Sequence, residues 1–424
     1  MPFLTDLDER AEVKGSRDPL GLVPIWSKFG RDVIGNLTTV TGSVRGFTTL
    51  LLGIELADML RDRLRSDASA PLDTFLRFEQ LAGYARYRCQ HDTQMRGYRR
   101  ISARINDGGR IRISAESRDQ ILSNQKIYGL WGLFTVPARS SGLLESGESR
   151  LTTGARSFIE RHYFPMLGNT HGVNLLLKLL ARESFDLQPN ARDVDLLESI
   201  GRIHSRQLRA QERDFYCQHL AWGGHSDTTQ GKQQALAEIL RGIQSEEFGF
   251  PEFRAVQKTA RNRNEALFVS LGKIDRLQRL IAPAGLLFGF LQNRDRQSTS
   301  LVAKQIAETW KRPLHIELPG IRELQTEISA ALQSAPEAQL WMNLSEALAS
   351  AEYMQVIELL VAINTSVMQR RHGAASWIVI EGGKLKVHLA DERAELVPVA
   401  EAEDYWRSTY FINSLWRIAR EVSA

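Results

Sequence analysis

The stretch VIGNLTTVTGSVRGFTTLLLGIEL, residues 33–56, decides whether the chain is a membrane protein, a nucleotide-binding loop protein or a helical protein. Its apolar side chains recur at alternating intervals of four and three residues, which is typical of one face of a helix. Arg45 and five threonines lower its hydropathy, whereas a membrane span needs about 20 mostly apolar residues. The chain has no Gly-Lys-Ser/Thr sequence, which excludes a P-loop. We therefore predict a buried pair of helices, with glycines that let neighbouring backbones approach closely.

Composition places the chain among globular proteins. Its 424 residues are 43% hydrophobic and 25% charged, enough apolar material for two or three domains. The two cysteines, Cys89 and Cys217, cannot build a disulfide framework and fit a reducing compartment. The first residues are acidic where a signal peptide would be basic. We therefore expect a cytoplasmic protein that does not associate with a membrane.

Arginine dominates the basic residues. Of 54 basic residues, 43 are Arg and 11 are Lys, while the net charge is only +4. Arginine suits bidentate contact with phosphate, although a GC-rich genome would also favour its codons. In GYRRISARINDGGRIRIS, residues 97–114, two β-prone runs flank a turn and predict a hairpin with arginines on one face. That face could contact phosphates or be a solvated sheet surface, and its candidate residues are Arg99, Arg100, Arg104, Arg110 and Arg112.

Residues 118–164 resemble a winged helix. The pattern predicts a helix from about residue 119 to 133, a short helix entered at Pro137, a strand and an N-capped helix. By this resemblance the second helix would enter the major groove, with Arg139, Ser140 and Ser141 as contacts and Arg150 on the wing. The same unit could instead serve only as a protein–protein module.

The predicted fold class is mainly α: a multi-lobed helical protein with a winged-helix-like unit and small β-hairpins. Residues 1–165 would form an N-terminal lobe and residues 166–371 a helical domain. Residues 372–424 would form a β-hairpin followed by a helix, because two strand-like runs meet at Gly382 and Gly383.

No catalytic signature stands out. Cys217, His219 and His225 cluster, but their spacing is not that of a zinc site. Glu381 and Lys384 have the wrong interval for a restriction-type nuclease. There is no G-x-S-x-G elbow and no strand followed by G-x-G-x-x-G. We predict no catalytic residue, metal or cofactor, and leave open an enzyme with an unrecognised metal-dependent nuclease site around one of these groups.

Three phrases carry a resemblance to one kind of bacterial protein: RDPLGLVPIWSKFGRDVIGNLTTVTGSVRG, IYGLWGLFTVPARSSGLL and RRHGAASWIVIEGGKLKVHL. Together they resemble proteins of bacterial defence islands, found beside genes for helicases and phospholipase-D-like nucleases. The resemblance implies a non-catalytic subunit of an anti-phage defence or DNA-processing complex. Such a subunit would bind nucleic acid through its arginines and protein partners, such as a helicase or nuclease, through helical faces. The alternative is a protein-only assembly scaffold.

Overall fold

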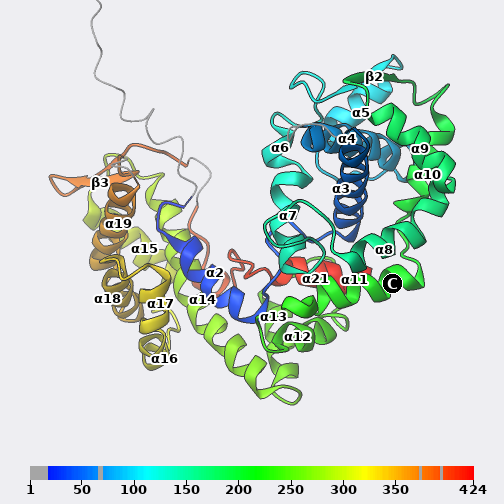
Figure 1. Ribbon diagram of the computed structural model, residues 1–424. Helices are drawn as coiled ribbons and strands as arrows, with labels where there is room; N and C mark the ends of the chain where they lie inside the picture. The colour runs from blue at the N-terminus through cyan, green and yellow to red at the C-terminus, as the bar shows by residue number, and fades with distance from the viewer. Residues whose placement is uncertain (1–17, 65–69, 372–374, 392–394) are drawn as a thin grey trace, which may run out of the picture. The chain divides into compact units, whose positions relative to one another are not determined.

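The computed structural model describes residues 18–64, 70–371, 375–391 and 395–424 (Figure 1). The protein is mainly helical, which confirms the predicted fold class. Contacts divide it into two compact units. The first unit contains the described residues up to Val33 and Ile243–Tyr410, and the second contains Ile34–Gly242 and Phe411–Ala424. This division differs from the three consecutive segments expected from the sequence, and the expected boundary at residue 372 lies outside the described residues.

The second unit is built around the packed pair α3 and α4. Its helices are α3 (Val44–Leu64), α4 (Ala70–Gln90), α5 (Tyr98–Asn106), α6 (Gln125–Tyr128), α7 (Leu130–Ser140), α8 (Thr153–His162), α9 (Asn169–Leu180), α10 (Val194–Ile203), α11 (Ala210–Tyr216), α12 (Lys232–Leu240) and α21 (Ile412–Glu421). A π-helix (Cys217–Ala221) continues α11, and short 3-10 helices cover Phe164–Leu167 and Gly224–Ser226. Strands β1 (Ile111–Ser114) and β2 (Ser184–Leu187) pair antiparallel.

The first unit is a second helical body. It contains α2 (Leu22–Val33), α13 (Phe250–Ala260), α14 (Glu265–Leu291), α15 (Thr299–Trp310), α16 (Leu318–Glu323), α17 (Gln325–Ala331), α18 (Glu337–Ala349), α19 (Tyr353–Arg370) and α20 (Val399–Glu403). Its strands β3 (Ile378–Glu381) and β4 (Lys384–Val387) confirm the predicted C-terminal hairpin. Gly382 and Gly383 form the turn with φ of 54° and 73°, a left-handed conformation that favours glycine.

The stretch that opens the sequence analysis spans the boundary between the two units. Helix α2 ends at Val33, and α3 begins at Val44 as a buried helix of the second unit. Gly46 lies against the ring of Phe134, and Gly53 lies against Phe75 and Phe78 of α4. These glycines allow the close packing of α3 that the sequence predicts. Among the described residues, no helix is long and apolar enough to cross a membrane.

We expect Gly53→Ala to destabilise the second unit although alanine is the better helix former. An added Cβ would lie 2.9 Å from Phe75 Cδ2 and 2.9 Å from Phe78 Cδ1, too close for a rigid packed interface. Overpacking of this kind costs about 1–3 kcal/mol. Gly154→Ala in α8 is the matched control, because no atom lies within 4 Å of the added Cβ. Urea unfolding should show opposite signs for the two variants; a stabilised Gly53→Ala would contradict the packing argument.

The hairpin predicted for residues 97–114 is wrong. Residues from Tyr98 to Asn106 form α5, in which Ile101 is buried against the unit and Ile105 follows one turn later. The four-residue interval between these isoleucines is compatible with a helix. Their alternation with arginine is equally compatible with a strand, so the pattern alone does not distinguish the two. Strand β1 forms as expected, but its partner is β2, more than seventy positions along the chain (Ile111 opposite Leu187).

The helix bounds in residues 118–164 also differ from those expected. The chain is helical only from Gln125, and Pro137 lies inside α7 rather than at the start of a separate helix. The expected wing is a single antiparallel bridge between Leu144 and Leu151. The N-capped helix is confirmed, since the Thr152 hydroxyl accepts a hydrogen bond from the Ala155 N–H at the start of α8.

Candidate functional site

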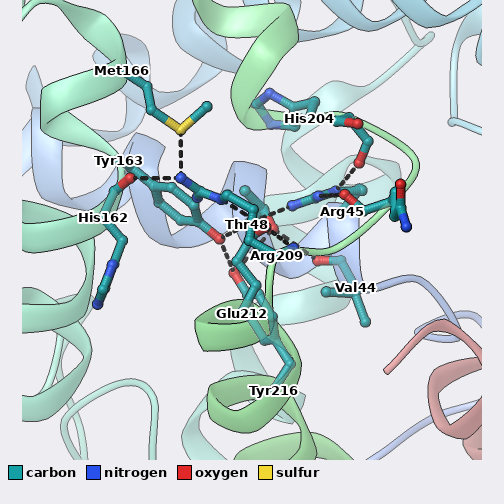
Figure 2. A network of polar contacts seen from close by, with 12 residues as sticks. Val44, Arg45, Thr48, His162, Tyr163, Met166, His204, Arg209, Glu212 and Tyr216 are labelled. Atoms are coloured by element: carbon teal, nitrogen blue, oxygen red, sulfur yellow. Dashed lines mark hydrogen bonds and ion pairs between the residues drawn. The ribbon is translucent and has the colours of Figure 1, made fainter. Parts of the chain in front are cut away.

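A buried ion pair organises the centre of the second unit (Figure 2). Arg45, in the first turn of α3, donates from Nη1 to Glu212 Oε1 of α11 at 2.6 Å. Both side chains are shielded from solvent, at 8% and 1% exposure. Burial alone would raise the pKa of Glu212, but hydrogen bonds from Arg45 and Arg209 outweigh it and lower the pKa to about 2. Glu212 therefore stays ionised at neutral pH.

Two tyrosines extend this pair into a polar cluster. The Tyr163 hydroxyl donates to Glu212 Oε1 at 2.9 Å and lies 3.2 Å from the Tyr216 hydroxyl. The Tyr216 hydroxyl in turn lies 2.9 Å from Thr48 Oγ1 of α3. Burial raises the pKa of Tyr216 to about 12, so its hydroxyl keeps its proton. The threonines of the opening stretch thus supply hydrogen bonds inside the core, which explains their presence on a buried helix.

Beside this cluster lies a cavity of about 570 Å³. It is lined by Gln90, Met166, Arg202, Ser205, Gln207, Leu208, Arg209, Ala210, Glu212 and Arg213. Three guanidinium groups thus face a single carboxylate, and that carboxylate already accepts hydrogen bonds from Arg45 and Arg209. The cavity therefore carries net positive charge.

The loop between α10 and α11 shapes this cavity. Arg45 Nε donates to the Ser205 carbonyl at 2.7 Å, and its Nη2 donates to the Gln207 carbonyl at 3.3 Å. His204 anchors the start of the loop through Thr49 Oγ1, 3.0 Å from its Nε2. Burial, followed by the charge of Arg86, lowers the pKa of His204 to about 3, so the ring is neutral. Buried side chains of α3 therefore hold the loop backbone in place through hydrogen bonds.

The sequence analysis did not predict the arginines of the cavity as functional residues. Arg202, Arg209 and Arg213 belong to a run with arginines at intervals of four, three and four, a spacing typical of one face of a single helix. The chain is not helical between Ile203 and Ala210, and the three arginines line one cavity. The repeated arginine spacing was the available signal, but it does not reveal the break.

The arginines predicted to bind nucleic acid mostly have partners within the chain. Arg112 Nε lies 3.3 Å from Asp119 Oδ2, and Arg150 Nε lies 3.0 Å from Asp58 Oδ1. Arg100, Arg104 and Arg139 donate to the backbone carbonyls of Gln120, Asp119 and Glu148 respectively. Ser140 is the half-buried last residue of α7, while Arg99 and Arg110 are exposed. Arg100, Arg104 and Arg112 thus lie close together, because all three contact residues 119–120.

The residues weighed as a metal site do not converge. Cys217 Sγ accepts from Arg241 Nη2 at 2.7 Å, whereas His219 Nδ1 lies 2.8 Å from the Ser141 carbonyl. Across the described ranges, no group of three or more His, Cys, Asp or Glu side chains is placed to hold a metal ion. Glu381 lies at the end of β3 and pairs with Lys386 at 3.1 Å. Nothing at either position supports nuclease chemistry.

The comparisons with known proteins give no name for this arrangement: no family model, no curated protein and no solved structure matches the chain. Function is therefore argued from the cavity and its surroundings.

A half-buried carboxyl near Arg45 predicts a pH effect. Glu421 of α21 accepts from the Val44 N–H at 2.9 Å, and burial raises its pKa from 4.5 to about 7. The folded state thus holds this proton more tightly than the unfolded chain. The stabilisation it gives is complete below pH 4.5 and is lost as the pH rises to about 7, by about 3 kcal/mol.

We expect Glu421→Gln to remove this pH dependence while keeping an oxygen for the Val44 N–H. The stability of the variant relative to the native protein should therefore rise between pH 4.5 and 7. Exposed Glu145→Gln is the control and should leave the pH profile unchanged. Urea unfolding at a series of pH values measures both; parallel profiles for native protein and Glu421→Gln would contradict the assignment.

Proposed function

We propose that this protein binds nucleic acid without catalysing a reaction, and that it contacts phosphate in the arginine cavity of the second unit. The observation that carries the proposal is the charge around the cavity. Arg202 and Arg213 donate to Ser199 Oγ and to the main-chain oxygen of Ala424, and the carboxylate of Glu212 already pairs with Arg45 and Arg209. Guanidinium groups so placed can form charge-assisted hydrogen bonds to phosphate oxygens.

The size of the cavity selects the form of nucleic acid. About 570 Å³ is in the range of pockets that hold small molecules, roughly 300–1,000 Å³. A duplex is too wide to enter such a space, whereas one or two nucleotides of a single strand fit. Gln90, Ser205 and Gln207 add neutral polar groups to the lining. The proposal therefore concerns single-stranded nucleic acid, in place of the major-groove contact expected from the winged-helix resemblance.

Salt-dependent binding tests the proposal. Fluorescence anisotropy with a labelled single strand and with a duplex of the same sequence should show tighter binding of the single strand. Its affinity should fall as salt rises, because each neutralised phosphate releases counterions. Arg202→Glu combined with Arg213→Glu should weaken binding by roughly tenfold or more and flatten the salt dependence. Incubation with Mg²⁺ or Mn²⁺ should leave the strands intact.

Two exposed arginines provide the matched control. Arg99→Glu combined with Arg110→Glu makes the same charge change on the segment first predicted to bind phosphate. This control should bind nearly as well as the native protein. If it loses binding while the cavity variant keeps it, the contact lies on residues 97–114 after all. The absence of any salt-sensitive binding would leave the scaffold alternative.

Membership of a defence or DNA-processing complex rests on the sequence resemblance, and one surface supports a protein partner. Ile127, Tyr128 and Val136 on α6 and α7 are 53%, 45% and 62% exposed. Large exposed apolar side chains can mark a protein interface. Co-expression with a helicase or nuclease encoded beside this chain tests the idea. Val136→Glu should abolish co-purification, and Leu175→Glu, which changes an exposed leucine of α9, should not.

A further inference from the structure

We infer that the arginine cavity binds a terminal phosphate monoester, the phosphorylated end of a single strand, in preference to the diesters within the strand. This inference rests on the proposed function and names the chemical group that the same cavity takes. Three observations carry it: the number of guanidinium groups, the fixed position of Arg209 and the limited volume of the cavity.

Charge favours the monoester. A phosphate monoester carries about −1.5 to −2 at neutral pH and has three terminal oxygens, whereas a diester carries a single negative charge. Arg202 Nη2 donates to Ser199 Oγ, and Arg213 Nη1 donates to the main-chain oxygen of Ala424. Arg209 shares its charge with Glu212. Three arginines beside one glutamate match a dianion better than a monoanion.

Arg209 is held in place before any ligand arrives. Its Nε donates to Glu212 Oε2 at 3.0 Å, and its Nη1 donates to the His162 carbonyl at 3.1 Å. The guanidinium carbon lies 5.3 Å from the centre of the Tyr163 ring, a cation–π contact. Figure 2 shows the Arg209 side chain over this ring. A cation fixed by three partners loses little side-chain entropy when an anion binds beside it.

Arg209 also has an unsatisfied donor. Its Nη2 is shielded from solvent and has no hydrogen-bond partner among the described residues. Buried polar atoms in folded proteins are nearly always hydrogen-bonded, because an unpaired one costs about 1–3 kcal/mol. The unpaired donor thus points to a ligand that brings a hydrogen-bond acceptor, and a phosphate oxygen is such an acceptor.

The cavity volume restricts which phosphate can enter. The volume of about 570 Å³ can hold the terminal nucleotide of a strand together with its phosphate. Met166, Leu208 and Ala210 supply apolar surface that suits a sugar or base next to the phosphate. The end of a strand therefore fits both the polar and the apolar parts of the lining.

The test compares oligonucleotides that differ only at one end. Single strands of identical sequence are prepared with a 5′-phosphate, a 3′-phosphate or hydroxyls at both ends, and binding to the full chain is measured by anisotropy. At moderate salt at least one phosphorylated end should bind roughly tenfold tighter than the hydroxyl strand. A nucleoside monophosphate should compete if the monoester alone is recognised. Equal affinity for all three strands would overturn the inference while leaving the proposed function intact.

Variants separate the cavity from the rest of the surface. Arg202→Ala combined with Arg213→Ala should reduce the preference for the phosphorylated end to about twofold or less, since neither residue bonds to the buried cluster. Arg99→Ala combined with Arg110→Ala should keep the preference. A preference that survives the cavity variant would contradict the inference. If no strand binds at all, the proposed function fails and this inference fails with it.

Discussion

Glu212→Ala is expected to lower the free energy of unfolding of the second unit by about 3–5 kcal/mol. The substitution removes the carboxylate that accepts from Arg45, Arg209 and Tyr163. Arg45 would then be a buried cation without a counter-charge, and desolvation of an unpaired charge is far more costly than the loss of a hydrogen bond. The same change would release the loop that shapes the arginine cavity, so ligand affinity should fall with stability.

A double variant distinguishes an unpaired charge from lost packing. Arg45→Met combined with Glu212→Leu replaces the pair by apolar side chains of similar size and should recover most of the stability lost in Glu212→Ala. Urea unfolding of the single and double variants gives the coupling between the two side chains. If the double variant is no more stable than Glu212→Ala, packing rather than charge accounts for the loss. Low pH offers a second check, because the stabilisation by Glu212 should disappear as the pH falls from 4.5 toward 2.

The sequence predicts the parts of this fold that depend on local patterns. Apolar periodicity gives the helical class, and Gly382 with Gly383 locates the turn between β3 and β4. The prediction fails where a local pattern fits two structures. In residues 97–114, isoleucines and arginines alternate and also recur at helical intervals, and the choice depends on burial of Ile101 in the folded unit. The partner of β1 is likewise set by tertiary contacts with residues 184–187.

The candidate site was beyond sequence reasoning for a related physical reason. Its cationic groups and the carboxylate of Glu212 lie within one stretch of chain, but Glu212 is held by Arg45 of α3, and the ring that Arg209 covers belongs to Tyr163. A dense run of arginines, such as residues 97–112, is easier to see in a sequence. There the folded chain itself supplies acceptors, including Asp119 for Arg112 and the Glu148 carbonyl for Arg139 farther along. Arginine content alone does not separate cations that hold the fold from cations left for a ligand.

Trp310→Ala should destabilise the first unit by about 3–5 kcal/mol. Trp310 is the last residue of α15 and is fully buried. Its Nε1 donates to the Val397 carbonyl at 3.0 Å, and its ring meets Tyr353 edge-on with centroids 6.0 Å apart. Alanine would leave a cavity and an unpaired carbonyl. Trp310→Phe is the control: it keeps most of the apolar contact, loses the hydrogen bond and should cost about 1–3 kcal/mol.

Glu212→Ala and Trp310→Ala together test whether the two compact units are also units of stability. Each residue contacts only its own unit in the pairs described above, so amide hydrogen exchange should show faster exchange in the second unit for Glu212→Ala and in the first for Trp310→Ala. If the units unfold separately, the double variant should show two independently shifted transitions. If both variants accelerate exchange throughout the chain by the same factor, the units unfold cooperatively. The stability of the arginine cavity would then depend on the packing of α15 as much as on Glu212. In that case Trp310→Ala would weaken ligand binding although Trp310 does not line the cavity.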